Sequence, residues 1–153
     1  EARLPLGTGR PPSEFRANVL IGNREIYRNR NDRLAIDFSV DVLDFAGTQV
    51  FDPRVVRIAP DKKNELHRHA HESLFYVISG KGELRIGEDL LPLEAGGLAF
   101  VPRWAFHQSR NLSSTDELVI LAVTDFGLTK AVLGDYDKRT RLAVQGKDVK
   151  EHG

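Results

Sequence analysis

The chain has 153 residues, enough for one domain with a sizeable core, and its 41% hydrophobic and 29% charged residues are ordinary for a globular protein. Its 22 basic and 22 acidic residues cancel, and the basic residues are scattered, which argues against nucleic acid or an anionic membrane as a partner. There is no cysteine, so disulfides, cysteine-bound zinc and thiol nucleophiles are excluded.

The N-terminal residues are rich in proline, glycine and arginine and are typical of an extended arm rather than a packed element. They contain no apolar signal-peptide stretch, and no run in the sequence is long enough to span a bilayer, which predicts a cytoplasmic protein. The chain also lacks methionine, so we expect its natural N-terminus to be trimmed. Residues 24–33 are too polar for a buried element, and we assign 1–33 to this N-terminal arm.

From Leu34 onward the hydrophobic pattern is that of strands. Apolar and polar residues alternate over 34–42, which indicates a half-buried strand. Short runs of the same kind follow, separated by turn signals, at 48–51, 54–59, 74–79, 83–87, 98–101 and 117–125. This spacing without a convincing helix predicts an all-β sandwich or barrel over 34–126. The C-terminal tail, 127–153, has some helical character around 128–133 and is otherwise polar.

Three of the five histidines alternate in the heptapeptide HRHAHES, residues 67–73. On a regular strand His67, His69 and His71 would point to the same face. Two imidazoles at this spacing can bind one metal ion, at about 2.0–2.2 Å from each nitrogen. A metal would also keep buried histidines neutral and remove their mutual repulsion. Exposed histidines beside a turn are the alternative interpretation of the His-x-His pair taken alone.

Residues 60–111 resemble the cupin superfamily, whose small jelly-roll β barrels carry two motifs separated by a variable hairpin. The first motif is Gly, five residues, His-x-His, three or four residues, Glu, six residues, Gly. The second is Gly, five residues, Pro-x-Gly, two residues, His, three residues, Asn. The matching residues are His67, His69 and Gly80 in the first motif and Gly96, Pro102, His107 and Asn111 in the second, while Asp61 and Trp104 replace two glycines. The resemblance implies a single cupin-type jelly-roll barrel in which His67, His69 and His107 bind one metal ion.

The glutamate of the first motif has no equivalent at the expected position. Counting back seven residues from Gly80 reaches Ser73, and Glu72 would point to the opposite face of a regular strand unless a bulge turned it inward. Three imidazoles on one strand span about 13 Å, so we expect His71 at the rim, as a bystander or a proton shuttle. We therefore predict a three-histidine site, with Ser73 and His71 as candidate catalytic residues; Ser73 would bond a metal-bound water or the substrate.

Three neutral ligands leave a divalent ion its full charge and up to three open positions, which favours a small chelating anionic substrate. Within cupins, such iron sites resemble those of thiol dioxygenases and of ring- or diketone-cleaving dioxygenases. The resemblance implies an Fe(II) dioxygenase using O2, with the substrate supplying the electrons; Mn, Ni, Zn and Cu stay open. The alternatives are a metal-dependent isomerase, epimerase or lyase on a sugar-acid-like substrate, and a non-catalytic cupin that binds a small molecule.

Several further side chains are candidates for binding the substrate. Strand parity points Phe75 into the cavity, although it can also be plain core. Arg57 and Arg85 could bind an anionic substrate, or could lie on a solvated outer face. Trp104 and Phe106, beside the third histidine, either wall the substrate or only cover the end of the barrel.

Self-association is expected from the unpaired edges of a short barrel. An extended arm can add a strand to a neighbour's sheet, which hides both edges. We therefore predict a homodimer to which residues 1–45 contribute, with Tyr76 outside the cavity near a subunit contact.

Overall fold

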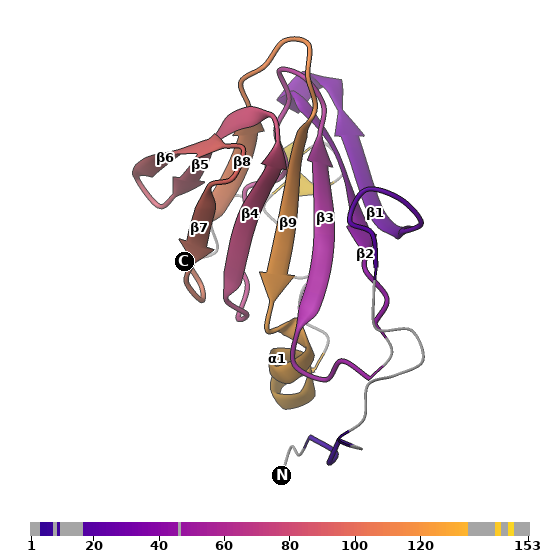
Figure 1. The fold of residues 1–153 in the computed structure, drawn as a ribbon. Coiled ribbons are helices and arrows are strands. Elements are labelled where there is room, and N and C mark those ends of the chain that lie inside the picture. Colours follow the sequence, from indigo (N-terminus) through magenta and orange to yellow (C-terminus); the bar gives the residue numbers. More distant parts are fainter. Residues whose placement is uncertain are drawn as a thin grey trace.

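Two antiparallel β-sheets face each other in the computed structural model, which describes residues 4–7, 9, 17–45 and 47–134 and the backbone of 143–144 and 147–148 (Figure 1). The larger sheet has the order β1-β2-β3-β9-β4-β7, formed by β1 (Arg24–Asn31), β2 (Ile36–Val42), β3 (Asp52–Ile58), β9 (Leu118–Thr124), β4 (Ser73–Ser79) and β7 (Leu98–Val101). The smaller sheet has the order β6-β5-β8, formed by β6 (Asp89–Glu94), β5 (Lys81–Ile86) and β8 (His107–Asn111). This arrangement confirms the predicted all-β jelly-roll barrel.

The remaining elements are short. They are a 3-10 helix (Asp32–Leu34), the helix α1 (Phe126–Leu133), and the strand pair β10 (Ala143–Val144) and β11 (Lys147–Asp148). Among the described residues, no helix has the length and hydrophobicity needed to cross a membrane. The prediction for the arm, 1–33, and for the tail, 127–153, falls partly on residues outside the described ranges.

The main core lies between the two sheets, because alternate side chains of each strand point inward. Its fully buried members come from both sheets and are Ile36, Phe38, Val40, Ile58, Phe75, Val77, Leu84, Leu93, Val101, Leu118, Ile120 and Ala122. Full burial of a side chain of this size stabilises the fold by roughly 1.5–3 kcal/mol. Val40, Phe75 and Ala122 of this core also line the cavity described below.

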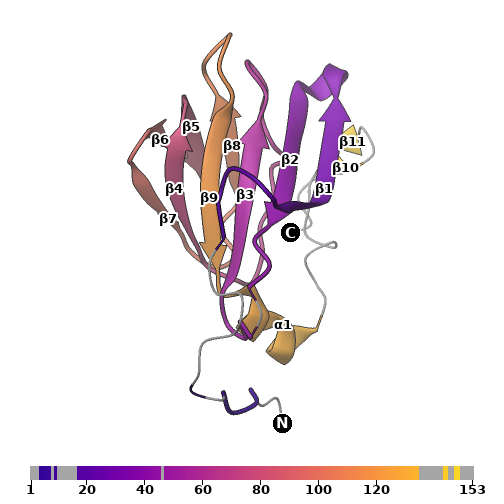
Figure 2. The ribbon, with the colours of Figure 1, turned by 45° about the vertical axis from the view of Figure 1, so that its right-hand side comes forward.

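A second apolar cluster lies on the outer face of the larger sheet. Its buried members are Leu43, Val55 and Val119, and Val19 and Phe45 pack against them. Figure 2 shows the indigo chain that precedes β1 crossing this face over β3 and β9. The central strands of the larger sheet are therefore buried on both faces.

Three strands of the two facing sheets were not predicted, nor was the short pair β10 and β11, and each of the three has a physical reason. The polar stretch that forms β1 is largely exposed and is held by backbone pairing with β2 rather than by burial. In β6, Pro92 is tolerated because β6 is an edge strand of the smaller sheet. β8 has the polar sequence HQSRN because its inward positions hold His107 and Ser109. The strand predicted at 48–51 was wrong: these residues form a loop before β3.

Tight turns explain the glycine positions of the two motifs. The four positions Asp61, Gly80, Gly96 and Trp104 have φ of 59°, 86°, 86° and 62°. These values lie in the left-handed region, which glycine adopts without strain. A Cβ at Gly80 would lie 2.5 Å from the carbonyl oxygen of Glu117, so only glycine fits there. The turn geometry of the motifs is therefore kept even where Asp61 and Trp104 replace glycine.

Candidate metal centre

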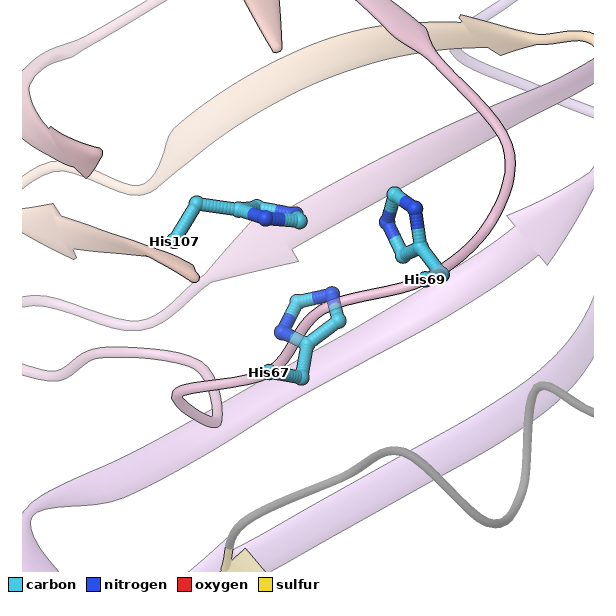
Figure 3. A group of neighbouring side chains, drawn as sticks. All are labelled: His67, His69 and His107. Carbon is cyan, nitrogen blue, oxygen red and sulfur yellow. The ribbon is translucent and has the colours of Figure 1, made fainter. Parts of the chain in front are cut away.

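Three histidines from two distant segments meet inside the barrel (Figure 3). His67 and His69 come from the loop between β3 and β4, and His107 is the first residue of β8. One ring nitrogen of each lies within 4.8 Å of those of the other two. The ring centroids are 5.3 Å apart for His67 and His69, 4.3 Å for His67 and His107, and 4.8 Å for His69 and His107. All three side chains are buried.

Backbone hydrogen bonds fix the positions of the three histidines. His67 and His107 lie opposite each other in an isolated antiparallel bridge. The backbone N–H of His67 donates to the carbonyl oxygen of His107 at 3.1 Å, and the reverse bond is 2.9 Å. The carbonyl oxygen of His69 accepts from the N–H of Trp104 at 2.8 Å. The two motifs are thus joined directly at the site.

Each ring is held in one tautomer by a carbonyl two residues away. The Nδ1 of His67 bonds the carbonyl of Glu65 at 2.8 Å, that of His69 bonds the carbonyl of His71 at 2.8 Å, and that of His107 bonds the carbonyl of Ala105 at 2.9 Å. A carbonyl oxygen only accepts, so each Nδ1 carries the proton and each Nε2 keeps its lone pair. Histidines that bind a metal through Nε2 have this arrangement.

A buried glutamate, Glu65, contacts the first histidine through its backbone carbonyl and β1 through its carboxylate. Glu65 is fully buried, and its Oε1 accepts hydrogen bonds from the Tyr27 hydroxyl at 2.5 Å and the Asn29 amide at 2.7 Å. Both donors lie on β1, and the carbonyl of the same Glu65 orients His67. β1 is therefore connected to His67 by hydrogen bonds through Glu65.

The histidines line a cavity of about 60 Å³, enough for roughly four waters. Its apolar wall includes Val40, Val56, Phe75 and Ala122, and its polar lining consists of Arg54, Asn64, His67, His69, His71, His107, Ser73 and Thr124. Among these described lining residues there is a guanidinium group and no carboxylate. The guanidinium group belongs to Arg54, which is paired with Asp52 behind the cavity wall, so the cavity suits a small polar ligand.

His71 and Ser73 both line this cavity. The sequence placed His71 at the rim, but the loop bends, so that its buried ring stacks on His69 with centroids 3.5 Å apart and an interplanar angle of 13°. Its other side meets the Phe126 ring edge-on at 5.2 Å. Ser73 is the first residue of β4, and its buried Oγ has no hydrogen-bond partner among the described residues. A hydroxyl so placed is available to a ligand in the cavity.

Glu72 points away from the histidines. Its side chain is half exposed, with one carboxylate oxygen 4.0 Å from Nη1 of Arg103. Its backbone N–H donates to the Asp125 side chain at 2.9 Å, and Arg103 also pairs with Asp125. This cluster holds the chain direction at the start of β4, so that Ser73 rather than Glu72 faces the cavity.

The arginines and aromatic residues named as substrate-binding candidates lie in different places. Phe75 lines the cavity, with its ring 6.1 Å from that of His107. Arg57 lies on the outer face of β3, where it contacts Glu117 at 3.3 Å and the carbonyl of Leu20 at 3.2 Å. Arg85 is exposed and bonds the carbonyl of Gly87 at 2.9 Å. Neither arginine is part of the cavity lining.

Trp104 and Phe106 lie on the loop before β8 rather than in the cavity lining. Trp104 is half exposed, and the Arg68 guanidinium lies 6.0 Å from its ring and 4.6 Å from that of Phe106. The two aromatic residues and Arg68 therefore cover the outside of the loop that carries the third histidine.

Arg54 is the charged cavity residue that the sequence reasoning missed, and Asn64 and Thr124 are polar lining residues that it also missed. It lies on β3, and its Nε and Nη2 bond the two carboxylate oxygens of Asp52 at 3.1 and 3.0 Å. Its guanidinium carbon is 5.2 Å from the centre of the Phe126 ring. These contacts fix the plane of the guanidinium group at the cavity wall.

Comparison with known proteins agrees with this geometry. Residues 54–124 match the family described as cupin domain. The fold is a cupin barrel. A cupin-2 domain protein of Rhodospirillum rubrum has a TM-score of 0.61 at 20% identity, covering 76% of either chain. The salicylate 1,2-dioxygenase of Pseudoaminobacter salicylatoxidans, in its W104Y form, has a TM-score of 0.57 at 15% identity, covering 63% of this chain and 29% of the dioxygenase.

A curated relative is the 1-hydroxy-2-naphthoate 1,2-dioxygenase of a Nocardioides species, strain KP7, which is 24% identical over 100 residues. The match covers 65% of this chain and 26% of the relative, so the chain spans about a quarter of the length of that protein. The cupin fold predicted from the two motifs is confirmed, and the three-histidine group could hold a metal ion.

Proposed function

We propose that this cupin is a cytoplasmic, mononuclear metal-dependent enzyme, an Fe(II) dioxygenase that acts with O2 on a small chelating anion, and that it forms a homodimer. The observation that carries the proposal is the group His67, His69 and His107, with each Nδ1 bonded to a carbonyl and the rings facing one small cavity. Other divalent metals compatible with three imidazoles are Mn, Ni, Zn and Cu.

The residues fit a divalent ion of this kind. Three neutral imidazoles with a lone pair on Nε2 are suitable ligands for Fe, Zn, Cu or Ni. The buried Oγ of Ser73 has no hydrogen-bond partner among the described residues, so a metal-bound water or a substrate atom would satisfy it. When bound, Fe(II) would supply the redox chemistry that makes O2 reactive.

The surrounding side chains would select and orient the substrate. Arg54 places a guanidinium group at the cavity wall, where Asp52 holds its Nε and Nη2, and this fixed group would orient an anionic substrate. Phe75 and its apolar neighbours exclude water on the opposite side, which strengthens electrostatic contacts within the cavity. Ser73 would hydrogen-bond the substrate, and His71 would hold His69 through ring stacking and its carbonyl.

The dioxygenase proposal is supported by the curated relative, which is named as a 1,2-dioxygenase of 1-hydroxy-2-naphthoate, an anion with adjacent hydroxyl and carboxylate groups. Such a substrate chelates a metal and supplies the charge that a fourth, carboxylate ligand would otherwise bring. An isomerase, epimerase or lyase acting on a sugar acid is the alternative reaction, and a binding protein without catalysis is the alternative class.

Metal content tests the site first. Protein purified with and without air should contain about one divalent ion per chain by elemental analysis, and His107→Ala should lose it. His152→Ala is the matched control, since this histidine is outside the two motifs and outside the described residues. An unchanged metal content in His107→Ala would show that the site is assigned to the wrong residues.

Oxygen consumption then tests the reaction. The iron-loaded protein should consume O2 with at least one member of a panel of hydroxy aromatic acids, thiols and diketones. If the purified protein holds zinc or nickel and turns over substrate equally well without O2, the oxygenase proposal is wrong and the isomerase or lyase alternative takes its place.

A further inference from the structure

Four large apolar side chains are exposed together on the outer face of the larger sheet, at its β7 edge. They are Leu74 and Tyr76 on β4 and Leu98 and Phe100 on β7, with exposed fractions of 46%, 43%, 67% and 53%. Leu74 lies directly opposite Phe100, and Tyr76 lies opposite Leu98, so they form two neighbouring cross-strand pairs. We call these four residues the β4–β7 patch.

The rest of the same face is already covered by the chain itself. Val19, Leu43 and Phe45 pack over Val55 and Val119, on the β3 and β9 side. Figures 1 and 2 show no described element in front of β4 and β7, in contrast to the chain that crosses β3 and β9. The apolar outer face therefore continues from a covered half to a half that none of the described residues covers.

We infer that the β4–β7 patch is the surface through which two copies of this chain meet. With roughly 100 Å² of each side chain exposed, the patch offers roughly 400 Å² of apolar surface, as large as the largest patches of typical monomers. A stable dimer buries about 800 Å² of each partner. The patch thus supplies about half of one partner's share, and the half-buried Val123 on β9, directly opposite Leu74, adjoins it.

A second copy fits this patch better than a charged partner does. The outward positions of β4 and β7 carry no charged residue, so the patch has nothing to pair with a charged macromolecule. The chain's formal net charge is zero, so two copies do not repel each other at long range. A β-sheet face can pack against an identical face, with side chains interdigitating, in an isologous two-fold interface.

The inference does not depend on the proposed metal chemistry. The cavity is lined by Ser73 and Phe75, whereas Leu74 and Tyr76 alternate with them on β4 and point to the opposite face. It also differs from the expectation that residues 1–45 form the contact, because part of that segment covers the chain's own sheet.

The mass in solution is the first test. By light scattering at micromolar concentration, the protein should have twice the 17.1 kDa mass of one chain. The double variant Leu98→Arg/Phe100→Arg should be monomeric, with a dissociation constant raised at least ~100-fold. Leu90→Arg, on the smaller sheet and 60% exposed, is the matched control and should stay dimeric. A monomeric parent protein, or a double variant that remains dimeric, would overturn the inference.

Cysteine cross-linking gives a second measurement that does not depend on the arginine variants folding. The chain has no cysteine, so a single introduced thiol is the only one present. With a bifunctional maleimide, Phe100→Cys should give a covalent dimer in high yield, and Leu90→Cys should remain largely a single chain. Equal yields at the two positions, or a dimer from Leu90→Cys alone, would place the contact elsewhere.

Discussion

Tyr27→Phe is a sharp test of how β1 supports the candidate metal centre. The change removes one hydroxyl and keeps the ring, whose centroid is 5.7 Å from that of Phe38 in the core. The lost group donates to Oε1 of Glu65 at 2.5 Å, and Glu65 is fully buried. The Asn29 amide would then be the remaining donor from β1 to that oxygen.

The size of the effect follows from the burial of Glu65. A hydrogen bond to a charged group contributes about 1.5–3 kcal/mol, and water cannot replace the missing donor at a buried site. We therefore expect the free energy of unfolding to fall by about 2 kcal/mol. For a domain of this size, that corresponds to a melting temperature lower by roughly 4–8 °C.

Urea unfolding of the chelator-treated protein measures this loss without a contribution from bound metal. Leu90→Ala is the control, because Leu90 is 60% exposed on β6 and outside the β4–β7 patch, and the stability should change by less than about 0.5 kcal/mol. If Tyr27→Phe is as stable as the parent protein, or if both variants lose the same amount, the proposed support of the site by β1 through Glu65 is wrong.

Three further changes have expected outcomes. Asn111→Ala should lower the free energy of unfolding, measured in urea, by about 3 kcal/mol. The buried Asn111 amide donates to the carbonyls of Ile58 and Asp116 and accepts from the Ser113 N–H, and all three bonds would be lost. A loss below about 1 kcal/mol would contradict this reasoning. Asp61→Gly should raise the free energy of unfolding by about 0.5–1 kcal/mol, because φ is 59° there, and a lower melting temperature would argue against strain. Arg54→Gln should weaken acetate binding to the metal-loaded protein at least ~10-fold by calorimetry, whereas Arg57→Gln should leave it unchanged.

The barrel and the three histidines could be predicted because both leave strong local signals. Alternation over 34–42 and short apolar runs between turns indicate strands without any tertiary information. Gly80 and Gly96 occupy turns with left-handed φ values, which glycine adopts without strain. His67, His69 and His107 are recognised by their spacing from these two turns. The cupin fold follows from these two kinds of signal together.

The strands that were not predicted are stabilised by contacts between residues distant in sequence, which a local hydrophobic pattern does not reveal. β1 is recognised by its backbone pairing with β2 and by Tyr27 and Asn29 reaching Glu65, which is 38 and 36 residues away. His71 was placed at the rim because a regular strand was assumed through 67–71. The chain instead bends there, since the Nδ1 of His69 bonds the carbonyl of His71.

The choice between Arg54 and Arg57 shows most directly where sequence reasoning stops. The two residues are three positions apart on β3, so at most one of them can face the cavity. The alternation of apolar and polar residues normally shows which positions of a strand face the core. In β3, however, Val55 is buried on the outer face and Ile58 on the inner face, so odd and even positions both carry apolar residues. The outer face is buried there because Val19, Leu43 and Phe45, which flank β1 and β2, pack over Val55 and Val119. This contact between distant segments makes both parities of β3 apolar, so the position of Arg54 at the cavity follows from tertiary packing that the sequence pattern of β3 alone does not reveal.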